Sequence, residues 1–292
     1  MQKYLYFFLL TASFAQVSDY AYTGAEVSAM AGAVVAEKGN DWSIFHNPAG
    51  LTEIDGTHFS AGGGRLYGFN WLPSYHLNGT IPIPIFGKTE FALQQLETKY
   101  DGAVLSTEQT ISIAQGFDLQ HDKNSHLAIG YTANFVQWDL AKSAGISGDG
   151  THGHELGSIN AVTVDLGVLA SLREKYRFGV FLKNINSGAL GRGMTRQVLA
   201  RRINAGITYM PNPDLSTSIV SEYLLGRDDL QIKGAIRYNL NPLLQIYAGA
   251  QSNPNRLGIG TTFTLNRQSI SYGLLTHPVL PMTHQFSLGF KL

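Results

Sequence analysis

The sequence has no cysteine and little charge, and each deficit excludes a class of protein. Without cysteine the chain forms no disulfide, so its stability depends on backbone pairing and burial. Charged residues make up only 14% of the 292 residues, and the 21 basic and 21 acidic side chains cancel. Because the Lys and Arg residues are scattered singly, the chain lacks the basic stripe of a nucleic-acid-binding protein, and nucleic acid is not expected as a partner.

Long apolar runs are also missing, and short alternating ones take their place. Hydrophobic residues make up 44% of the chain, yet no run reaches the roughly 18 residues that a membrane-spanning helix requires. Apolar and polar residues instead alternate along Arg202–Tyr209, Arg256–Leu265 and Gln285–Leu292. A period of two indicates β-strands with one apolar and one polar face. The sequence therefore predicts an all-β fold rather than a helical membrane protein.

Fourteen alternating stretches follow one another and predict an antiparallel transmembrane β-barrel of fourteen strands. An even number places both ends of the barrel on one side, where bacterial outer-membrane barrels carry short turns. The two longest connections, 141–160 and 187–200, follow odd-numbered strands, as this arrangement requires. The proline-rich segment 81–86 is an exception, because it is long for a periplasmic turn. The predicted strands are 58–66, 72–79, 89–98, 106–120, 126–140, 161–172, 176–186, 201–210, 215–225, 229–240, 243–252, 256–266, 268–279 and 283–292.

The charged residues of these strands decide which face is turned to the lumen. About fourteen strands enclose a lumen that eight strands would fill with side chains. A Lys or Arg facing lipid at mid-depth would cost about 2–4 kcal/mol, so the polar face must point inward and Ile207 and Ile259 must face lipid. Aromatic residues near strand ends, among them Phe178, Tyr209 and Trp138, are expected at the membrane interfaces. The residues predicted to face the lumen are Asp165, Lys183, Arg202, Glu222, Lys233 and Arg237.

Four apolar residues share this inward register and could line an apolar pocket. They are Leu169, Phe181, Leu224 and Leu275. The charged and small residues of the same face favour a filled lumen instead. Both interpretations remain open from the strands alone.

The N-terminal segment divides into two parts. Residues 1–15 have a cationic tip, a short apolar core and a small-x-small exit, which predicts a signal peptide. Residues 16–57 contain a run of small residues, 25–33, that could form a short helix, and then Asn47 and Pro48. Pro48 ends a helix and holds Asn47 extended. We expect 16–57 to be a partly helical plug and 58–292 to be the barrel, with an external N-terminal helix as the alternative.

The sequence contains no persuasive metal or catalytic motif. His152, His154 and Glu155 are the densest group of metal-ligand types, but they lie among glycines in a predicted exposed loop, where a solvated loop is the simpler account. No Gly-x-Ser-x-Gly elbow occurs, and no Ser, His and Asp set stands out. The chain is therefore expected to be neither an enzyme nor a protein with a metal or other cofactor.

Several short motifs resemble those of a known family. Ala29-Met30-Ala31-Gly32-Ala33, then Asp41, and then Asn47-Pro48-Ala49-Gly50-Leu51 resemble the N-terminal signature of the FadL superfamily of outer-membrane proteins. The segments 164–167, 183–185, 202–209, 271–273 and 283–288 resemble its PorV/PorQ-like branch. The resemblance implies a bacterial outer-membrane barrel closed by a hatch to which Asn47, Pro48 and Ala49 belong. It departs at the final residue, Leu292, where such barrels commonly end in an aromatic residue.

Three functions are compatible with these features, the third of which is a structural barrel with no transport role. The first is a plugged channel that takes up a hydrophobic small molecule from outside and predicts an apolar pocket beside the plug. The second is an accessory barrel of type IX secretion that binds exported proteins or secretion-system subunits and conducts nothing, which predicts a filled lumen. Expected partners are the lipid bilayer and, in the lumen, a hydrophobic molecule, lipid or detergent.

Overall fold

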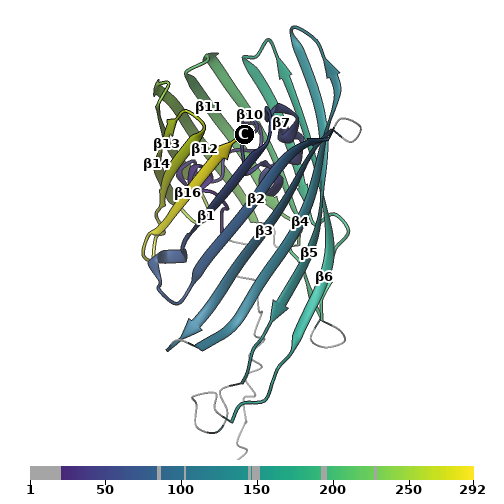
Figure 1. Cartoon of the computed structure of the whole chain (residues 1–292), viewed down its shortest axis with the longest axis vertical. Helices are drawn as coiled ribbons and strands as arrows, with labels where there is room; N and C mark the ends of the chain where they lie inside the picture. Colours follow the sequence, from purple (N-terminus) through teal and green to yellow (C-terminus); the bar gives the residue numbers. More distant parts are fainter. Residues whose placement is uncertain are drawn as a thin grey trace, which may run out of the picture.

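A computed structural model describes residues 21–83, 87–101, 103–143, 146, 152–191, 196–226 and 229–292, so the predicted signal peptide lies outside the described residues. The structure confirms the predicted antiparallel barrel of fourteen strands (Figure 1), which closes where β1 pairs with β16 along its whole length. The strands are β1 (His58–Arg65), β2 (Pro73–Ile83), β3 (Gly87–Tyr100), β4 (Ala103–His121), β5 (Ser125–Asp139), β6 (Ser158–Leu172), β7 (Tyr176–Lys183), β10 (Arg202–Asn212), β11 (Leu215–Leu224), β12 (Asp229–Asn241), β13 (Leu244–Gln251), β14 (Arg256–Leu265), β15 (Gln268–Leu275) and β16 (Thr283–Lys291).

The two ends of the barrel differ in the length of their connections. At the turn end, where β1 begins and β16 ends, β6–β7, β10–β11, β12–β13 and β14–β15 are joined by two or three residues. At the loop end, a long connection between β7 and β10 carries a small hairpin of β8 (Ala189–Leu190) and β9 (Gln197–Val198), which alternation did not predict. The short 3₁₀ turn η3 (Leu66–Gly68) joins β1 to β2 at the same end.

The proline-rich segment does not form the long turn that the sequence analysis expected. β2 continues through Pro82, which lies opposite Lys88 of β3, so only three residues separate these strands. The predicted strand ended at Gly79 because Pro82 interrupts the alternation of apolar and polar residues. The connection between β2 and β3 is consequently shorter than predicted. β15, in contrast, ends at Leu275 rather than at the predicted Val279.

The outer face of the barrel is apolar. Ile207 is 51% exposed and Ile259 is 61% exposed, and both project away from the lumen. Tyr176 and Tyr209 stack on this face with ring centroids 5.3 Å apart. The expected position at the membrane interface is wrong for Trp138. This residue lies on the inward face of β5 and packs against a buried cluster that includes Leu190 at the loop end. A continuous apolar exterior is what a membrane-spanning barrel requires.

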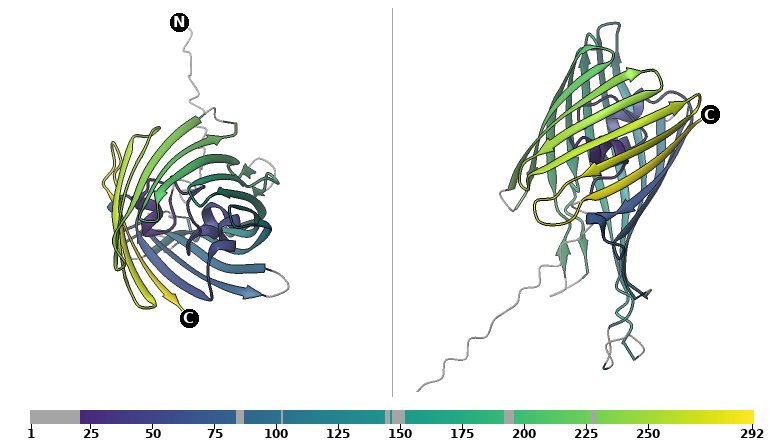
Figure 2. Two further views of the ribbon diagram at one scale, coloured as in Figure 1. Left: turned by 90° about the horizontal axis from the view of Figure 1, so that it is seen from above. Right: turned by 90° about the vertical axis from the view of Figure 1, so that its left-hand side faces the viewer.

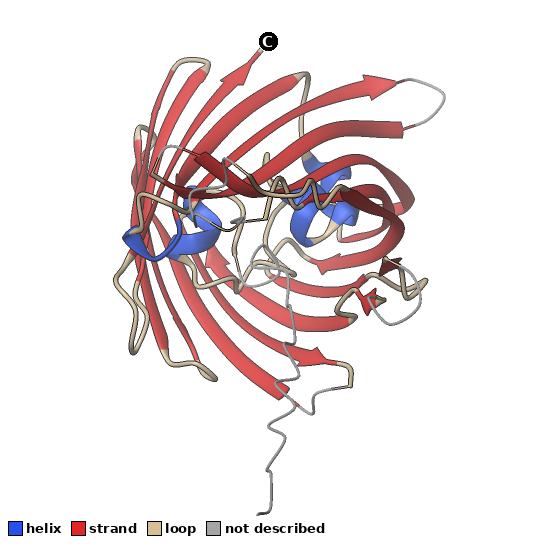
Figure 3. Cartoon of the chain, turned by 90° about the horizontal axis from the view of Figure 1, so that it is seen from below, coloured by secondary structure: helices blue, strands red, loops and turns tan. Residues whose placement is uncertain are grey.

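The N-terminal segment lies inside the barrel (Figures 2 and 3) and is called the plug below, from residue 21 to residue 57. It contains α1 (Ala25–Ala29), α2 (Ser43–His46) and the 3₁₀ helix η2 (Pro48–Glu53). The predicted helix at 25–33 is therefore shorter than expected, and α2 and η2 were not anticipated. No helix in the described part of the chain is long and apolar enough to cross a membrane.

Candidate functional site

Asn47, Pro48 and Ala49, the three predicted hatch residues, connect α2 to η2 in the middle of the plug. Asn47 is extended, with φ −168° and ψ 98°, because a residue before proline avoids the helical region. Its side-chain amide donates to the carbonyl of Val35 at 2.7 Å and to that of Val168 on β6 at 3.1 Å, and its Oδ1 accepts from the amide of Ala49 at 3.2 Å. One side chain thus joins two parts of the plug to the barrel wall.

The wall meets this part of the plug through glycines. Gly116, Gly130 and Gly167 lie directly opposite one another on β4, β5 and β6. A Cβ atom at Gly130 would lie 2.5 Å from the amide nitrogen of Ala49, and one at Gly167 would lie 2.8 Å from Cδ of Pro48. Real carbon atoms do not approach so closely. The absence of side chains at these three positions therefore allows the plug backbone to touch the sheet.

The same arrangement recurs around the lumen. Gly179 faces Gly206 across β7 and β10, and both meet Val35 of the plug. On the far side, Gly249 faces Gly258, where a Cβ would lie 2.7 Å from Cα of Met30 and 2.8 Å from the carbonyl carbon of Ala29, respectively. We call these cross-strand sets the glycine tracks. They fix the path of the plug through shape rather than through side-chain contacts.

Two plug carboxylates add charged contacts near the turn end. Glu37 accepts a hydrogen bond from Ser216 at 2.9 Å and another from Ser218, and it forms an ion pair with Arg237 at 3.3 Å. Glu53 pairs with Arg177 and accepts from the backbone amide of Gly39 at 2.7 Å. Burying these carboxylates is compatible with stability because each one has charged and hydrogen-bonded partners. The plug is therefore held by reversible polar contacts as well as by packing.

The six charged residues predicted for the lumen all lie on the inward face, and they divide into separate groups. Arg202 and Lys233 both contact Glu222, at 3.1 and 2.7 Å. The Lys233 ammonium also lies 4.9 Å from the centroid of the Tyr22 ring in the plug. Arg237 binds Glu37 of the plug, as described above. Arg202 is therefore paired with Glu222 of the neighbouring strand β11.

Asp165 and Lys183 are the remaining two of this set. The Asp165 carboxylate accepts from the backbone amide of Asn184 at 2.7 Å and from the side chain of Asn134 at 2.8 Å. Asp165 and Lys183 line a cavity of about 60 Å³ between the plug and β3–β7, next to Ile44 and Phe45. This volume is sufficient for only a few water molecules.

The four inward apolar residues do not line an open apolar pocket beside the plug. Leu169, Phe181, Leu224 and Leu275 are all buried, the first against Ala49 and the second against the plug cluster that includes Trp42. The plug occupies the space that such a pocket would need. Among the described residues, the larger recesses therefore lie outside the plugged section of the lumen.

Two of the recesses lined by described residues bear on the passage of a small molecule. One, of about 670 Å³, opens at the turn end and is rich in charged residues, among them Lys38, Glu53, Arg173 and Arg177. The other, of about 810 Å³, lies on the apolar outer face over β15, β16 and β1–β4. We call the second one the outer recess. Its apolar lining includes Phe59, Leu77, Phe91, Ile111, Ile270 and Leu288.

Sequence reasoning missed two clusters that involve histidine. His58 binds Asp41 of the plug at 2.9 Å. Asp118, His121 and His126 bring potential metal ligands together on the β4–β5 hairpin, and their close spacing around a predicted turn was the available signal. The predicted loop residues His152 and His154 are exposed, and Glu155 lies 3.8 Å from Lys142.

Comparisons with known proteins bear on the fold. The sequence matches no protein-family model and no curated protein. Among solved structures, the toluene transporter TbuX of Ralstonia pickettii is 10% identical with a TM-score of 0.62, over 92% of this chain and 98% of TbuX. The monoaromatic hydrocarbon channel CymD is 10% identical with a TM-score of 0.61, over 92% and 97%. A FadL homologue of Pseudomonas aeruginosa is 12% identical with a TM-score of 0.53, over 92% and 98%.

At these identities the similarity concerns architecture. The alignments cover nearly the whole of both chains. These structures give no support to the predicted PorV/PorQ-like branch. Closed barrels of this type are proteins of the bacterial outer membrane, which agrees with the predicted location. The chain therefore has the fold of the FadL-type outer-membrane barrels.

Proposed function

We propose that this protein is a plugged outer-membrane channel that takes up hydrophobic small molecules, with Asn47, Pro48 and Ala49 as its hatch. A barrel of fourteen strands encloses more space than its own side chains fill, and the plug occupies that space. The plug is attached by hydrogen bonds, ion pairs and glycine contacts, all of which break and re-form without damage to the barrel. The fold of TbuX and CymD, which transport toluene and conduct monoaromatic hydrocarbons, supports this class of substrate.

The position of the two recesses favours an exit through the wall. Binding in the charged turn-end recess would not lower the free energy of an apolar molecule, because the molecule would remain exposed to water and ions there. The outer recess offers an apolar surface that continues into the lipid. This apolar recess is the observation that carries the proposal.

The sheet behind the outer recess is in direct contact with the plug. Ser60 of β1 donates to the Asp41 carboxylate at 2.5 Å, and Asn78 of β2 donates to the Asp41 carbonyl. Ala61, Gly79 and Gly289 also line the recess, so this part of the wall carries small side chains. A shift of the plug at Asp41 would release hydrogen bonds from the strands that separate the lumen from the recess.

A disulfide between plug and wall tests whether the plug must move. Ala49 and Ala128 of β5 are both fully buried and pack in one cluster. Because the chain has no native cysteine, Ala49→Cys/Ala128→Cys introduces one defined bond, whose formation is checked by thiol titration. The barrel is reconstituted in liposomes, and entry of a hydrophobic fluorescent probe is followed. Oxidation should stop probe entry, and reduction should restore it.

A second cysteine pair controls for the effect of a disulfide on the barrel itself. Ile207 and Ile219 lie opposite each other on the outer face of β10 and β11, away from the plug. Oxidised Ile207→Cys/Ile219→Cys should leave probe entry unchanged. Equal entry with the plug locked and unlocked would overturn the hatch. No probe entry in any form would overturn the channel and direct attention to the accessory role in secretion, tested by capture of exported proteins on the loops.

A further inference from the structure

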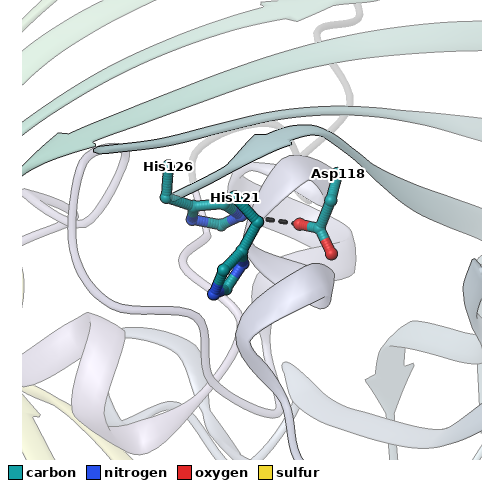
Figure 4. Close-up of side chains that lie close together, drawn as sticks. All are labelled: Asp118, His121 and His126. Atoms are coloured by element: carbon teal, nitrogen blue, oxygen red, sulfur yellow. Dashed lines mark hydrogen bonds and ion pairs between the residues drawn. The ribbon is translucent and has the colours of Figure 1, made fainter. Parts of the chain in front are cut away.

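We propose that Asp118, His121 and His126 form a binding site for one divalent transition-metal ion of the Zn²⁺ class at the turn end of the barrel. Figure 4 shows the three side chains together on the β4–β5 hairpin, with Asp118 and His126 joined by a hydrogen bond. The proposal is independent of what the barrel transports.

The hairpin positions the ligands through a β-bulge. His121 and His126 are direct cross-strand partners on either side of the turn, and their ring centroids lie 4.9 Å apart. The register shifts between Asp118 and Gln120, so one extra residue separates Asp118 from the turn. In a regular strand, residues three positions apart, such as Asp118 and His121, point to opposite faces, but the bulge turns both toward the lumen. The bulge therefore brings a carboxylate to the two imidazoles.

The geometry fits a small cation with nitrogen and oxygen ligands. One ligand atom of each residue lies within 4.8 Å of the other two. Around tetrahedral Zn²⁺, with bonds of about 2.0–2.2 Å, ligand atoms are about 3.3 Å apart. Asp118 and Nε2 of His126 are now 2.6 Å apart, and Asp118 is exposed, so it is free to withdraw by the small distance required. Two imidazoles favour Zn²⁺, Co²⁺, Ni²⁺ or Cu²⁺ over Mg²⁺ and Ca²⁺.

A plug residue stands in the position of a supporting partner. Nδ1 of His126 lies 3.7 Å from Oε1 of Glu53, while Nε2 points to Asp118. In metal sites the second nitrogen of a ligating histidine commonly faces a carboxylate, which orients the ring. Glu53 is the last residue of η2. It also accepts a hydrogen bond from the Gly39 amide and forms an ion pair with Arg177. A metal ion on the hairpin would therefore fix His126 and, through it, the turn end of the plug.

The site is accessible to ions and solvent. His121, His126 and Glu53 line the turn-end recess of about 670 Å³. Arg177, a cationic side chain close to Glu53, is already neutralised by that carboxylate. Three protein ligands in an open recess leave a coordination position for water, as in open zinc sites.

Metal titration of the folded barrel tests the proposal. Protein without an affinity tag, refolded in detergent and stripped with a chelator, is titrated with Zn²⁺ by calorimetry and with Co²⁺ by visible absorption. We expect one ion per barrel. His121→Ala should weaken binding by at least about tenfold and remove the cobalt absorption band. His121 is exposed, so its loss leaves the fold intact, and His152→Ala at the loop end, equally exposed, should bind as the unaltered protein does.

The supporting role of Glu53 is tested separately. Glu53→Gln keeps the size of the side chain and should weaken Zn²⁺ by about tenfold without abolishing it. Absence of Zn²⁺ binding by the unaltered protein at micromolar concentration would overturn the site. So would weak binding at several positions that His121→Ala leaves unchanged, because it would locate the ions elsewhere.

Discussion

At the residue scale, the wall of this barrel recognises its plug at positions that carry no side chain. Gly116, Gly130 and Gly167 form one continuous track on β4–β6, and the plug backbone at Pro48 and Ala49 fills it. Glycine normally weakens a strand by roughly 0.5–1 kcal/mol relative to alanine. Here that weakness is offset by contact between two backbones that no larger residue would allow.

A single methyl group should therefore dislodge the hatch. Gly130→Ala would place a carbon 2.5 Å from the amide nitrogen of Ala49, so the plug must shift while the barrel still closes. We expect a folded barrel with an increased ion leak in planar bilayers. In Gly234→Ala the new carbon meets only the Ser218 carbonyl, at 3.8 Å, and this variant should conduct as the unaltered protein does. Equal leak from both variants would contradict the glycine track.

Asn47 offers a second test at this scale. Asn47→Ala removes the bonds to Val35, Val168 and Ala49, which should destabilise the seated plug by about 1–3 kcal/mol. We expect faster proteolysis of the plug and more ion leak, with an unchanged barrel by circular dichroism. Asn186→Ala, on an exposed loop-end residue, serves as the matched control. An intact, protease-resistant plug in Asn47→Ala would remove this residue from the hatch.

Some residue-level features were predictable and others were not. The inward position of Lys233 or Arg237 follows from alternation together with the high energy of a cation in lipid. The extended Asn47 follows from Pro48. The partners of these residues did not follow, because Glu222 and Glu37 reach them from another strand and from the plug. A glycine in a strand signals close approach of some backbone, but only the folded chain identifies which one.

At the scale of elements, the plug is a series of short helical pieces whose shape the barrel imposes. α1 and α2 have five and four residues, too few to be stable alone in water. They were missed or mis-sized from sequence for that reason, since their conformation depends on contacts rather than on a repeating pattern. The strands, with a period of two over eight or more residues, were found nearly to their ends. Pro82 hid the end of β2 because it interrupts the pattern without interrupting the strand.

The plug should also respond to acid through His46. Burial in the lumen, with smaller effects from Lys183 and Lys233, lowers the pKa of His46 to about 4, and its ring contacts the Thr23 carbonyl at 2.9 Å. A released plug would expose this imidazole, whose ordinary pKa is about 6.5. The released form then binds a proton between pH 6.5 and 4 that the seated form does not. Above pH 6.5 the His46 ring does not weaken the seating of the plug. As the pH drops below 6.5, the equilibrium constant for seating falls by up to about tenfold per pH unit.

The measurement is ion leak at pH 7 and pH 5 in the unaltered protein and in His46→Gln. The unaltered barrel should leak more at pH 5 than at pH 7. His46→Gln keeps a hydrogen-bond donor but has no titrating ring, so it should lose this difference. An equal rise in both proteins would assign the acid response to a group other than His46.

At the scale of the whole molecule, the barrel separates two tasks. Its outer face is built for lipid, with Ile207 opposite Phe178 and Ile219 on neighbouring strands. Its inner face is built for one particular plug. The first property is a matter of pattern and could be read from sequence. The second depends on how strands more than a hundred residues apart face the same segment, and alternation contains no information about that.

The outer face gives the whole-molecule prediction. Ile207→Arg places a cation in the lipid-facing band at a cost of about 2–4 kcal/mol, so insertion into vesicles should be impaired. The fraction of folded barrel is measured by gel electrophoresis of unheated samples, in which folded and unfolded barrels migrate differently. Leu156→Arg, an exposed residue of the loop-end connection, adds the same charge outside the membrane and should insert normally. Normal insertion of Ile207→Arg would mean that the assigned facing is wrong.

The glycine tracks also restrict how the chain can change in length. Successive residues of a strand point to opposite faces, so a single-residue insertion between Gly167 and the turn that precedes β7 would turn that glycine and its neighbours toward lipid and bring side chains against Pro48. Insertions beyond the strand ends leave the tracks untouched. Related sequences able to accommodate this plug should therefore differ freely in the length of their loops, while the number of residues between track and turn stays constant.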